Sequence, residues 1–249
     1  EQPVDVLFIL AYTLTEYGME QKIDLFIKEA IHYYATILAT QPDHVRAINN
    51  LGMCFLHLEK PREAGRCFVQ AIQLEGNNAI FYNNLGLVAR LENLPDQSLN
   101  CCQKAIDLNP NYPEAYNNLG NALKDLNQLE AAKAAYEKAI SLDASPDFKC
   151  NLALALLTMG DFKAGWKMYE WRQTPPVLHP APHTAPPARW RGEAAPGKTL
   201  LLSCEQGLGD TIQFCRYAPL VKAKDVRVLL HAPRPLVRLL QSLDGVDAV

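Results

Sequence analysis

The sequence predicts a mostly α-helical protein, in which an α-solenoid of repeated helix pairs is followed by a partial α/β, Rossmann-like unit. The first observation is the string Asn-Asn-Leu-Gly, which stands at residues 49–52 and recurs at 83–86 and 117–120, 34 residues apart each time. The second is a proline-rich stretch at 173–197, and the third is a change of apolar period over 198–249. Together they divide the chain into a solenoid over 1–172, a connector and an α/β segment.

The repeats account for about two thirds of the chain. A fixed period of this length indicates a solenoid in which each unit buries its apolar face against its neighbours. In the clear repeats the second helix carries a small residue, then an aromatic residue or a thiol, then alanine, as at Ala64, Phe68 and Ala71, and these share one helix face. The expected repeats lie near residues 11–44, 45–78, 79–112, 113–146 and 147–172. The first is degenerate, and its turn is expected near Gly18 or near Leu25, two alternatives that the pattern leaves open.

This helix-turn-helix pattern closely resembles the tetratricopeptide repeat. The resemblance implies a module that binds a protein or peptide partner on a concave groove. An asparagine stands just before the leucine in successive repeats, and two more stand close by, so the expected groove residues are Asn50, Asn84, Asn118 and Asn151, with Asn117 and Asn121. An amide offers two donors and an acceptor oxygen, which suits contact with the backbone of an extended peptide. The alternative is that asparagine is simply common at this position of the repeat.

The charge distribution helps to exclude classes of partner. The net charge of −3 is the sum of −6 over residues 1–172, with 15 basic and 21 acidic residues, and +3 over 173–249, with 9 and 6. An acidic solenoid argues against nucleic acid as its ligand. No apolar run reaches 18 residues, so no membrane span is expected. The N-terminus also lacks the basic start of a signal peptide.

The cysteine and histidine patterns indicate neither a disulfide framework nor a metal site. None of the seven cysteines is spaced as Cys-x-x-Cys. We expect those on the helical repeats to be buried thiols in a reducing cytoplasm: Cys54, Cys67, Cys102 and Cys150. His179 and His183 are four residues apart in the proline-rich connector, where that spacing does not build a metal site, and we expect no metal.

One literal motif match is rejected. Residues 192–199 satisfy the pattern G-x-x-x-x-G-K-[ST] of a phosphate-binding loop. Such a loop needs a strand before it and a helix after it, so that the helix N-terminus faces the phosphate. Here a proline-rich stretch precedes the motif and a strand is expected after it, so nucleotide hydrolysis is not predicted.

The last part of the chain is expected to alternate strands and helices. The predicted strands lie at 199–203, 226–231 and 245–249, and the predicted helices at 210–223 and 234–243. This βαβαβ order begins a doubly wound parallel sheet. About fifty residues are too few to cover both faces of such a sheet.

The loop after the first predicted strand is the expected ligand loop. It contains Glu205, Gln206, Gly207 and Gly209, and it leads to Asp210. Ligands of open α/β sheets bind at the carboxyl ends of the strands, and glycines permit close backbone approach and unusual dihedrals. The alternative is structural: Asp210 caps the helix N-terminus and the glycines form a tight turn.

The runs Leu200-Leu201-Leu202, Gly209-Asp210 and 245–249 resemble the start of the heptosyltransferase-like glycosyltransferases of the two-domain B-type fold. The arrangement of the chain, with repeats followed by this α/β segment, is similar to that of bacterial tetratricopeptide proteins fused to such a domain. It also resembles that of the protein O-linked N-acetylglucosamine transferases, which have an asparagine ladder on their repeats. The resemblance implies that Asp210 is the general base on an acceptor hydroxyl and that the donor is a nucleotide sugar, with no cofactor in this chain.

The second domain of the B-type fold supplies most of the nucleotide-sugar site, and this chain lacks it. We therefore expect the chain alone to be inactive. The alternative function is a non-catalytic tetratricopeptide scaffold whose α/β segment is only a structural cap.

Overall fold

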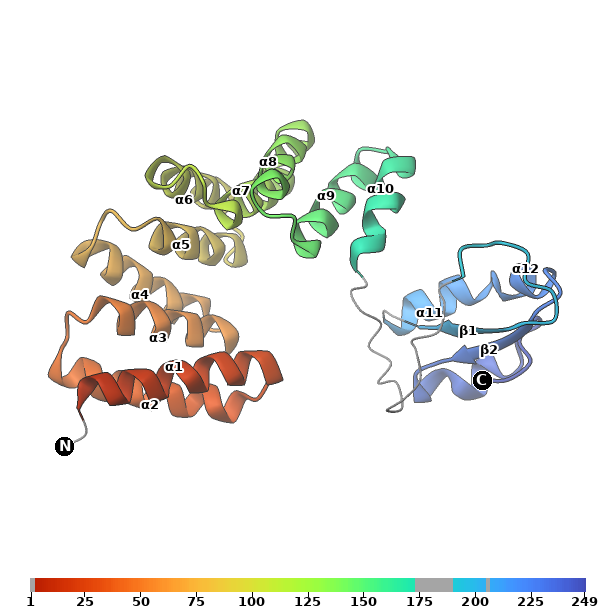
Figure 1. Cartoon of the computed structure of the whole chain (residues 1–249), viewed down its shortest axis with the longest axis horizontal. Helices are drawn as coiled ribbons and strands as arrows, with labels where there is room; N and C mark the ends of the chain where they lie inside the picture. Colours follow the sequence, from red (N-terminus) through yellow and green to blue (C-terminus); the bar gives the residue numbers. More distant parts are fainter. Residues whose placement is uncertain (1–2, 173–189, 205–206) are drawn as a thin grey trace. The chain divides into compact units, whose positions relative to one another are not determined.

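The computed structural model describes residues 3–172, 190–204 and 207–249. The chain divides into two compact units, residues 1–175 and 176–249, which we describe separately (Figure 1). The first is entirely helical, and the second combines a parallel sheet with short helices. The mostly α fold, with a solenoid followed by a small α/β unit, is confirmed.

The first unit is a succession of antiparallel helix pairs. Its helices are α1 (Val4–Gln21), α2 (Asp24–Thr40), α3 (Val45–His57), α4 (Pro61–Leu74), α5 (Ala79–Leu91), α6 (Pro95–Leu108), α7 (Pro113–Asp125), α8 (Leu129–Leu142), α9 (Pro146–Thr158) and α10 (Phe162–Tyr169), followed by the 3₁₀ turn η1 (Glu170–Arg172). Each odd-numbered helix packs against the helix that follows it, and each even-numbered helix packs against the next pair. Proline opens several of these helices, where its missing N–H costs no hydrogen bond.

The first helices of the pairs form the inner layer of the stack. α1 contacts α3, α5 contacts α7, and α7 contacts α9. No comparable contact joins successive second helices within the described part of the solenoid. Elements are closest together on the inside of a curved stack, so the first helices line its inner side and the second helices its outer side.

The recurrent glycine sets the distance between the two helices of each pair. A Cβ atom added to Gly52 would lie 2.7 Å from the ring of Phe68, and one added to Gly120 would lie 2.6 Å from the ring of Tyr136. At Gly86 the nearest atom is the sulfur of Cys102, at 2.9 Å. The glycine therefore makes room for the large buried residue of the second helix.

The first pair differs from the others in its helix lengths. α1 begins at Val4, ahead of residue 11 where the expected first repeat starts, and its C-terminal cap, Lys22, has a left-handed φ of 56°. The N–H of Ile23 bonds to the carbonyl of Gly18 at 2.9 Å, which closes this helix end. The turn thus lies at residues 22–23, between the two expected positions, and Gly18 is a buried helix residue packed on Ile27.

The α/β unit is built on two parallel strands, β1 (Thr199–Ser203) and β2 (Arg227–His231), which pair in register from Thr199 with Arg227 to Ser203 with His231. Its helical elements are α11 (Leu208–Cys215), α12 (Ala218–Lys222), η2 (Arg234–Leu236) and α13 (Val237–Leu240). Leu230, Leu236 and Leu240 form its buried cluster.

Three expected elements of this unit are shorter than predicted. The helix expected over 210–223 is broken between α11 and α12, where Pro219 in the first turn of α12 cannot donate a backbone hydrogen bond. The helix expected over 234–243 is a 3₁₀ turn followed by the short α13. The expected third strand is a single parallel bridge between Leu229 and Ala248.

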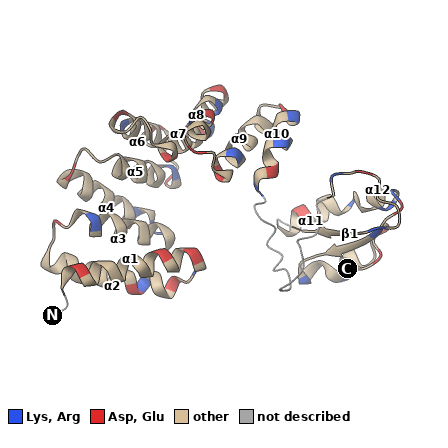
Figure 2. Ribbon diagram, in the orientation of Figure 1, with Lys and Arg blue, Asp and Glu red and all other residues tan. Residues whose placement is uncertain are grey.

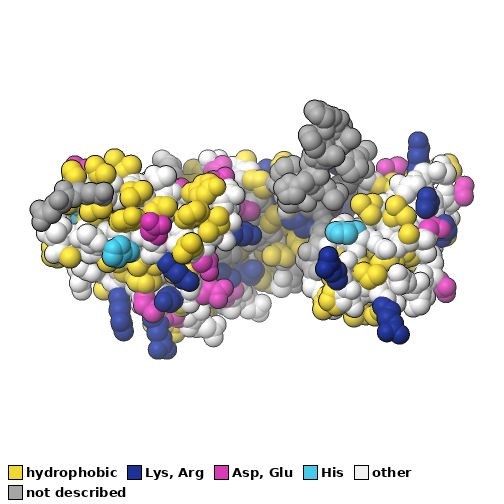
Figure 3. All heavy atoms as spheres, turned by 90° about the horizontal axis from the view of Figure 1, so that it is seen from below, with side chains coloured by type: hydrophobic (Ala, Val, Ile, Leu, Met, Phe, Trp, Pro, Cys, Tyr) yellow, Lys and Arg dark blue, Asp and Glu magenta, His cyan; other side chains and the backbone are white. Residues whose placement is uncertain are grey.

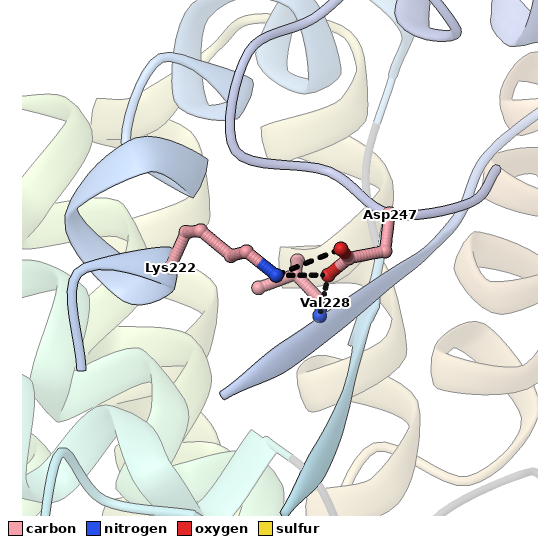
Figure 4. Close-up of polar contacts among 3 residues, drawn as sticks. All are labelled: Lys222, Val228 and Asp247. Atoms are coloured by element: carbon pink, nitrogen blue, oxygen red, sulfur yellow. Dashed lines mark hydrogen bonds and ion pairs between the residues drawn. The ribbon is translucent and has the colours of Figure 1, made fainter. Parts of the chain in front are cut away.

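A polar contact holds this last segment beside β2. Asp247 accepts the backbone N–H of Val228 at 2.7 Å, and Lys222 Nζ donates to both carboxylate oxygens at 2.7 Å (Figure 4). The Asp247 N–H in turn bonds to the Val228 carbonyl at 2.8 Å. The segment therefore lies beside β2 without becoming a strand of the two-stranded sheet.

The surfaces of the two units differ in charge, with acidic residues in excess on the solenoid and basic residues in excess on the α/β unit (Figure 2). Exposed apolar side chains gather on α1 and at the start of α2 (Figure 3): Val6, Ile9, Leu10, Tyr12, Tyr17 and Leu25. None of the described helices combines the length and the apolar character that crossing a membrane requires.

The cysteines are free thiols. Cys54, Cys67 and Cys102 are buried as expected, and burial raises the pKa of each of them. Cys150 is only half-buried, which corrects the expectation for this residue, because its helix α9 belongs to the last pair of the stack.

Candidate functional site

The asparagines of the repeated string form a hydrogen-bonded row across the solenoid. Each inter-repeat bond runs from the Nδ2 of the second asparagine of one string to the Oδ1 of the first asparagine of the preceding string. The bonds are Asn84 to Asn49 at 3.0 Å, Asn118 to Asn83 at 2.9 Å and Asn151 to Asn117 at 2.8 Å. We call these six residues the asparagine row. It joins first helix to first helix, so it runs along the inner layer.

The residues of the asparagine row are more buried than residues on a solvent-filled groove would be. Asn83 and Asn84 are only 5% and 7% exposed, while Asn49, Asn117, Asn118 and Asn151 are half-buried. A buried amide without a partner costs free energy, so the inter-repeat bonds stabilise the stack. The half-buried members still present part of each amide to solvent.

Further polar side chains extend the row within the repeats. Asn49 donates to Oδ1 of Asn50 at 3.1 Å, which attaches that predicted groove residue to the row. Asn83 donates to the Tyr112 hydroxyl at 3.4 Å. Burial raises the pKa of Tyr112 to about 12, so its hydroxyl stays protonated at physiological pH.

Asn121, also expected on the groove, lies apart from the row. It is 9% exposed, and its Oδ1 accepts a hydrogen bond from the Tyr136 hydroxyl at 2.8 Å. Burial raises the pKa of Tyr136, so the hydroxyl remains a donor. Asn121 therefore supports the buried ring within its own repeat. A separate ion pair between Arg90 Nε and Asp125 Oδ2, at 2.7 Å, ties neighbouring first helices together.

Asn49 and Asn83 are functional candidates that the sequence analysis missed. They are two of the three acceptors of the row, and their equivalent positions in successive strings, 34 residues apart, were the available signal. Thr15 occupies the corresponding position of the first repeat and bonds to the carbonyl of Ala11. Cys150 occupies it in the last repeat and ends the row, because a thiol cannot replace an amide acceptor.

The α/β unit has a second candidate site at the carboxyl end of β1. Asp210 is exposed in the first turn of α11. The N-cap is Gly207, which corrects the expectation that Asp210 caps this helix: Asp210 already lies inside the helix, and no side chain caps it. A Cβ added to Gly207 would lie 3.7 Å from Asp210 Oδ2, so the carboxylate turns back toward the loop.

The two loop glycines have ordinary backbone conformations. Gly207 has φ −64° and ψ 171°, and Gly209 is not among the glycines with positive φ. The unusual dihedrals expected for them are therefore absent, because one is the N-cap and the other is a helical residue. The space around a Cβ at Gly209 is open. Glu205 and Gln206, the rest of the expected ligand loop, lie outside the described residues.

Ser203 and His231 are the last residues of β1 and β2, at the same edge as the Asp210 loop. Ser203 Oγ lies 3.4 Å from His231 Nδ1, and the N–H of Cys204 bonds to the His231 carbonyl at 3.1 Å. The sequence analysis did not select this pair, although each residue ends a predicted strand. Polar side chains at this edge can contact a ligand of the sheet.

The rejected phosphate-loop pattern is followed by a strand, as expected. Residues 192–199 lead directly into β1, with no helix to receive a phosphate. No group of three metal-ligating side chains occurs among the described residues. His179 and His183, with most of the proline-rich connector, lie outside them.

Comparison with known proteins agrees with the helix-pair geometry. A family model described as "Tetratricopeptide repeat" matches residues 45–78 and 113–146, and one described as "TPR repeat" matches residues 96–127. Residues 45–78 and 96–146 of the helical unit therefore match tetratricopeptide repeats.

Solved structures share this tetratricopeptide fold. MamA is 24% identical over 61% of this chain and 90% of its own, with a TM-score of 0.52. A thermophilic TPR protein from Thermus thermophilus is 18% identical over 68% of this chain and 89% of its own, with a TM-score of 0.59. YrrB, described as a TPR protein with an unusual peptide-binding site, is 20% identical over 66% of this chain and 82% of its own, with a TM-score of 0.50. At these identities the likeness concerns the fold alone.

Among curated proteins, Protein FlbA of Caulobacter vibrioides is 32% identical over 194 residues. The match covers 76% of this chain and 33% of FlbA. The chain therefore spans about a third of the length of this relative. The similarity to FlbA covers more of the chain than the family models, which match only residues 45–78 and 96–146.

Proposed function

We propose that the tetratricopeptide unit binds an extended protein or peptide segment on its inner side, with the asparagine row contacting the backbone of the partner. The observation that carries this proposal is the row itself. It repeats one polar group at one position of each repeat, and four of its six amides remain partly open to solvent.

The amide chemistry of the row suits this role. Asn118 and Asn151 each use Nδ2 in the row, and among the described residues no side chain or backbone group donates to their Oδ1 atoms. Each Oδ1 can accept an N–H from a peptide backbone, and the second hydrogen of each Nδ2 can donate to a carbonyl. Amides arranged in this way recognise backbone, and leave selection among side chains to the residues beside them.

Selection of random peptides displayed on phage against the intact chain tests this proposal. We expect selected peptides to lose about 5- to 100-fold in affinity on Asn118→Ala, measured by fluorescence anisotropy, since one to two hydrogen bonds are removed. The matched control is Asn100→Ala, an exposed asparagine on the outer helix α6. Peptides that bind both variants as tightly as the unmodified chain would refute a backbone contact by the row.

We further propose that the α/β unit is the start of a nucleotide-sugar-dependent glycosyltransferase domain, in which Asp210 is the general base. The support is its place: an exposed carboxylate in the first turn of α11, beyond the carboxyl end of β1, in a unit whose two parallel strands end at Ser203 and His231. A carboxylate in that position removes a proton from an acceptor hydroxyl within hydrogen-bond reach. The free cysteines fit a cytoplasmic location.

Transfer of labelled sugar by the longest natural form of the protein tests this second proposal. We expect Asp210→Asn to reduce transfer by about 10²–10⁴-fold, the usual contribution of a general base, while binding of a selected peptide to the inner side stays unchanged. Asp225→Asn, in the turn before β2 at the amino ends of the strands and so at the opposite edge of the sheet from Asp210, is the control. Transfer that survives Asp210→Asn would refute the general-base role of Asp210, and absence of transfer by the unmodified protein would leave the scaffold function.

A further inference from the structure

A hollow on the solenoid lies outside the asparagine row. It has a volume of about 870 Å³ and is bounded by α4 on one side and by α5 with the turn that follows it on the other. Its apolar wall includes Val69, Leu85 and Val88. Since α4 is a second helix of its pair, the hollow belongs to the outer layer of the stack.

A glycine forms part of the wall of the hollow. Gly65 lies in the middle of α4 and lines it, and a Cβ added there would meet only Val88, at 3.2 Å. The residues 34 and 68 positions further on are Leu99 and Lys133, and Leu99 packs against the buried cluster around Tyr136. The repeat at 45–78 therefore lacks the apolar side chain that Leu99 supplies at this position in the next repeat.

The rim of the hollow carries two arginines one helical turn apart. Arg62 has a side chain that is 87% exposed, and its only ion pair within the described residues is a 3.9 Å contact with Glu92. Arg66 is exposed and has no carboxylate within ion-pair distance among those residues. On an acidic solenoid, this pair of cations is a local site for carboxylates.

We propose that this outer hollow is a second docking site, which takes an acidic peptide segment with one apolar anchor. The aliphatic side chain of the anchor fills the space beside Gly65 against Val88, and carboxylates on either side of it pair with Arg62 and Arg66. The size of the hollow is that of sites that bury one ligand-sized group, and the charge of the rim selects an anionic partner. The site is independent of the inner asparagine row.

A panel of fluorescein-labelled synthetic peptides tests the site on the full chain. The first peptide carries one leucine flanked by glutamates on both sides, the second replaces the leucine by glycine, and the third replaces the glutamates by lysines. We expect saturable anisotropy binding of the first peptide only. Equal binding of the leucine-free peptide, or no binding of the first, would overturn the proposal.

Variants of the chain then locate the site. Gly65→Leu introduces the residue that the next repeat carries at this position, so the helix has a precedent for it, and we expect it to weaken binding by at least tenfold. Arg66→Gln, an exposed change that leaves the core intact, should weaken it several-fold, with a smaller loss at high salt. Lys104→Gln, on α6 and outside the hollow, is the charge-matched control.

The proposals for the inner asparagine row and for the outer hollow can be refuted independently of each other. Asn118→Ala should leave binding of the glutamate-flanked peptide unchanged, because that residue is not in the hollow. If Asn118→Ala weakens it and Gly65→Leu does not, the peptide binds the inner side and the outer site is refuted.

Discussion

The bond between Asn84 and Asn49 is the sharpest test of the asparagine row, because one partner is 7% exposed and the other is half-buried. Asn84→Ala removes a buried amide together with its hydrogen bond, and should cost about 0.5–1.5 kcal/mol. Asn49→Ala leaves the buried Asn84 amide without its acceptor, and should cost about 1–3 kcal/mol. The less buried partner, Asn49, is therefore expected to be the more costly one to remove.

The double variant isolates the bond itself. We expect a coupling energy of about 0.5–1.5 kcal/mol between the two positions, measured from urea unfolding followed by far-ultraviolet circular dichroism. Asn100→Ala on α6 measures the gain of about 0.5 kcal/mol that alanine brings to an exposed helix position, which is then subtracted. A coupling energy below about 0.3 kcal/mol, the usual limit of additivity, would show that the row contributes nothing to the stack.

Three further expectations follow from particular contacts. Gly120→Ala places a Cβ 2.6 Å from the buried tyrosine ring on α8 and should lower the free energy of unfolding by about 1–3 kcal/mol, despite the gain in helix propensity; an unchanged urea midpoint would contradict this. Ser98 is buried with an Oγ that has no partner among the described residues, so Ser98→Ala should raise the melting temperature by a few degrees, and a fall would show an overlooked bond. Hydrogen bonds from Lys222 and from the Val228 amide lower the pKa of Asp247 in the folded protein below its ordinary value of 3.8. These bonds therefore stabilise the fold fully above pH 3.8, and that contribution is lost as the pH falls through the pKa of Asp247 in the folded protein. The hydrogen-exchange protection factor of the Val228 amide should therefore fall below pH 3.8, and in Asp247→Ala it should be low at every pH.

The repeats could be predicted from the sequence because their signal is local and periodic. The Asn-Asn-Leu-Gly string places the glycine against the large residue of the next helix, and Gly52 and Gly120 lie in those contacts. The partners of the asparagines could not be predicted in this way. Whether Asn84 donates to a peptide or to Asn49 depends on the offset between successive repeats, which is a property of the stack and not of one period.

The α/β unit shows where patterns of hydrophobicity lose precision. β1 has the bounds that the apolar run predicts, because a short apolar run between turn residues has few other conformations. The helix breaks at residues 216–217, between α11 and α12, but the spacing of apolar residues continues across the break and so does not predict it. Residues 245–249 satisfy a strand pattern, but only the bridge at Ala248 forms, since pairing depends on the neighbouring segment as well as on composition.

The direction of the bonds in the asparagine row has a consequence for changes in the number of repeats. The strings at 83–86 and 117–120 each accept a bond from the repeat after them and donate one to the string before them, at the same atoms. Deleting residues 79–112 would bring the string at 117–120 next to the one at 49–52, where Asn118 would take the role of Asn84. Duplicating the same segment would add one link of the same kind. The solenoid can therefore change length by whole periods during evolution or engineering while its polar row remains satisfied, whereas a deletion that is not a multiple of 34 residues would leave buried amides without partners.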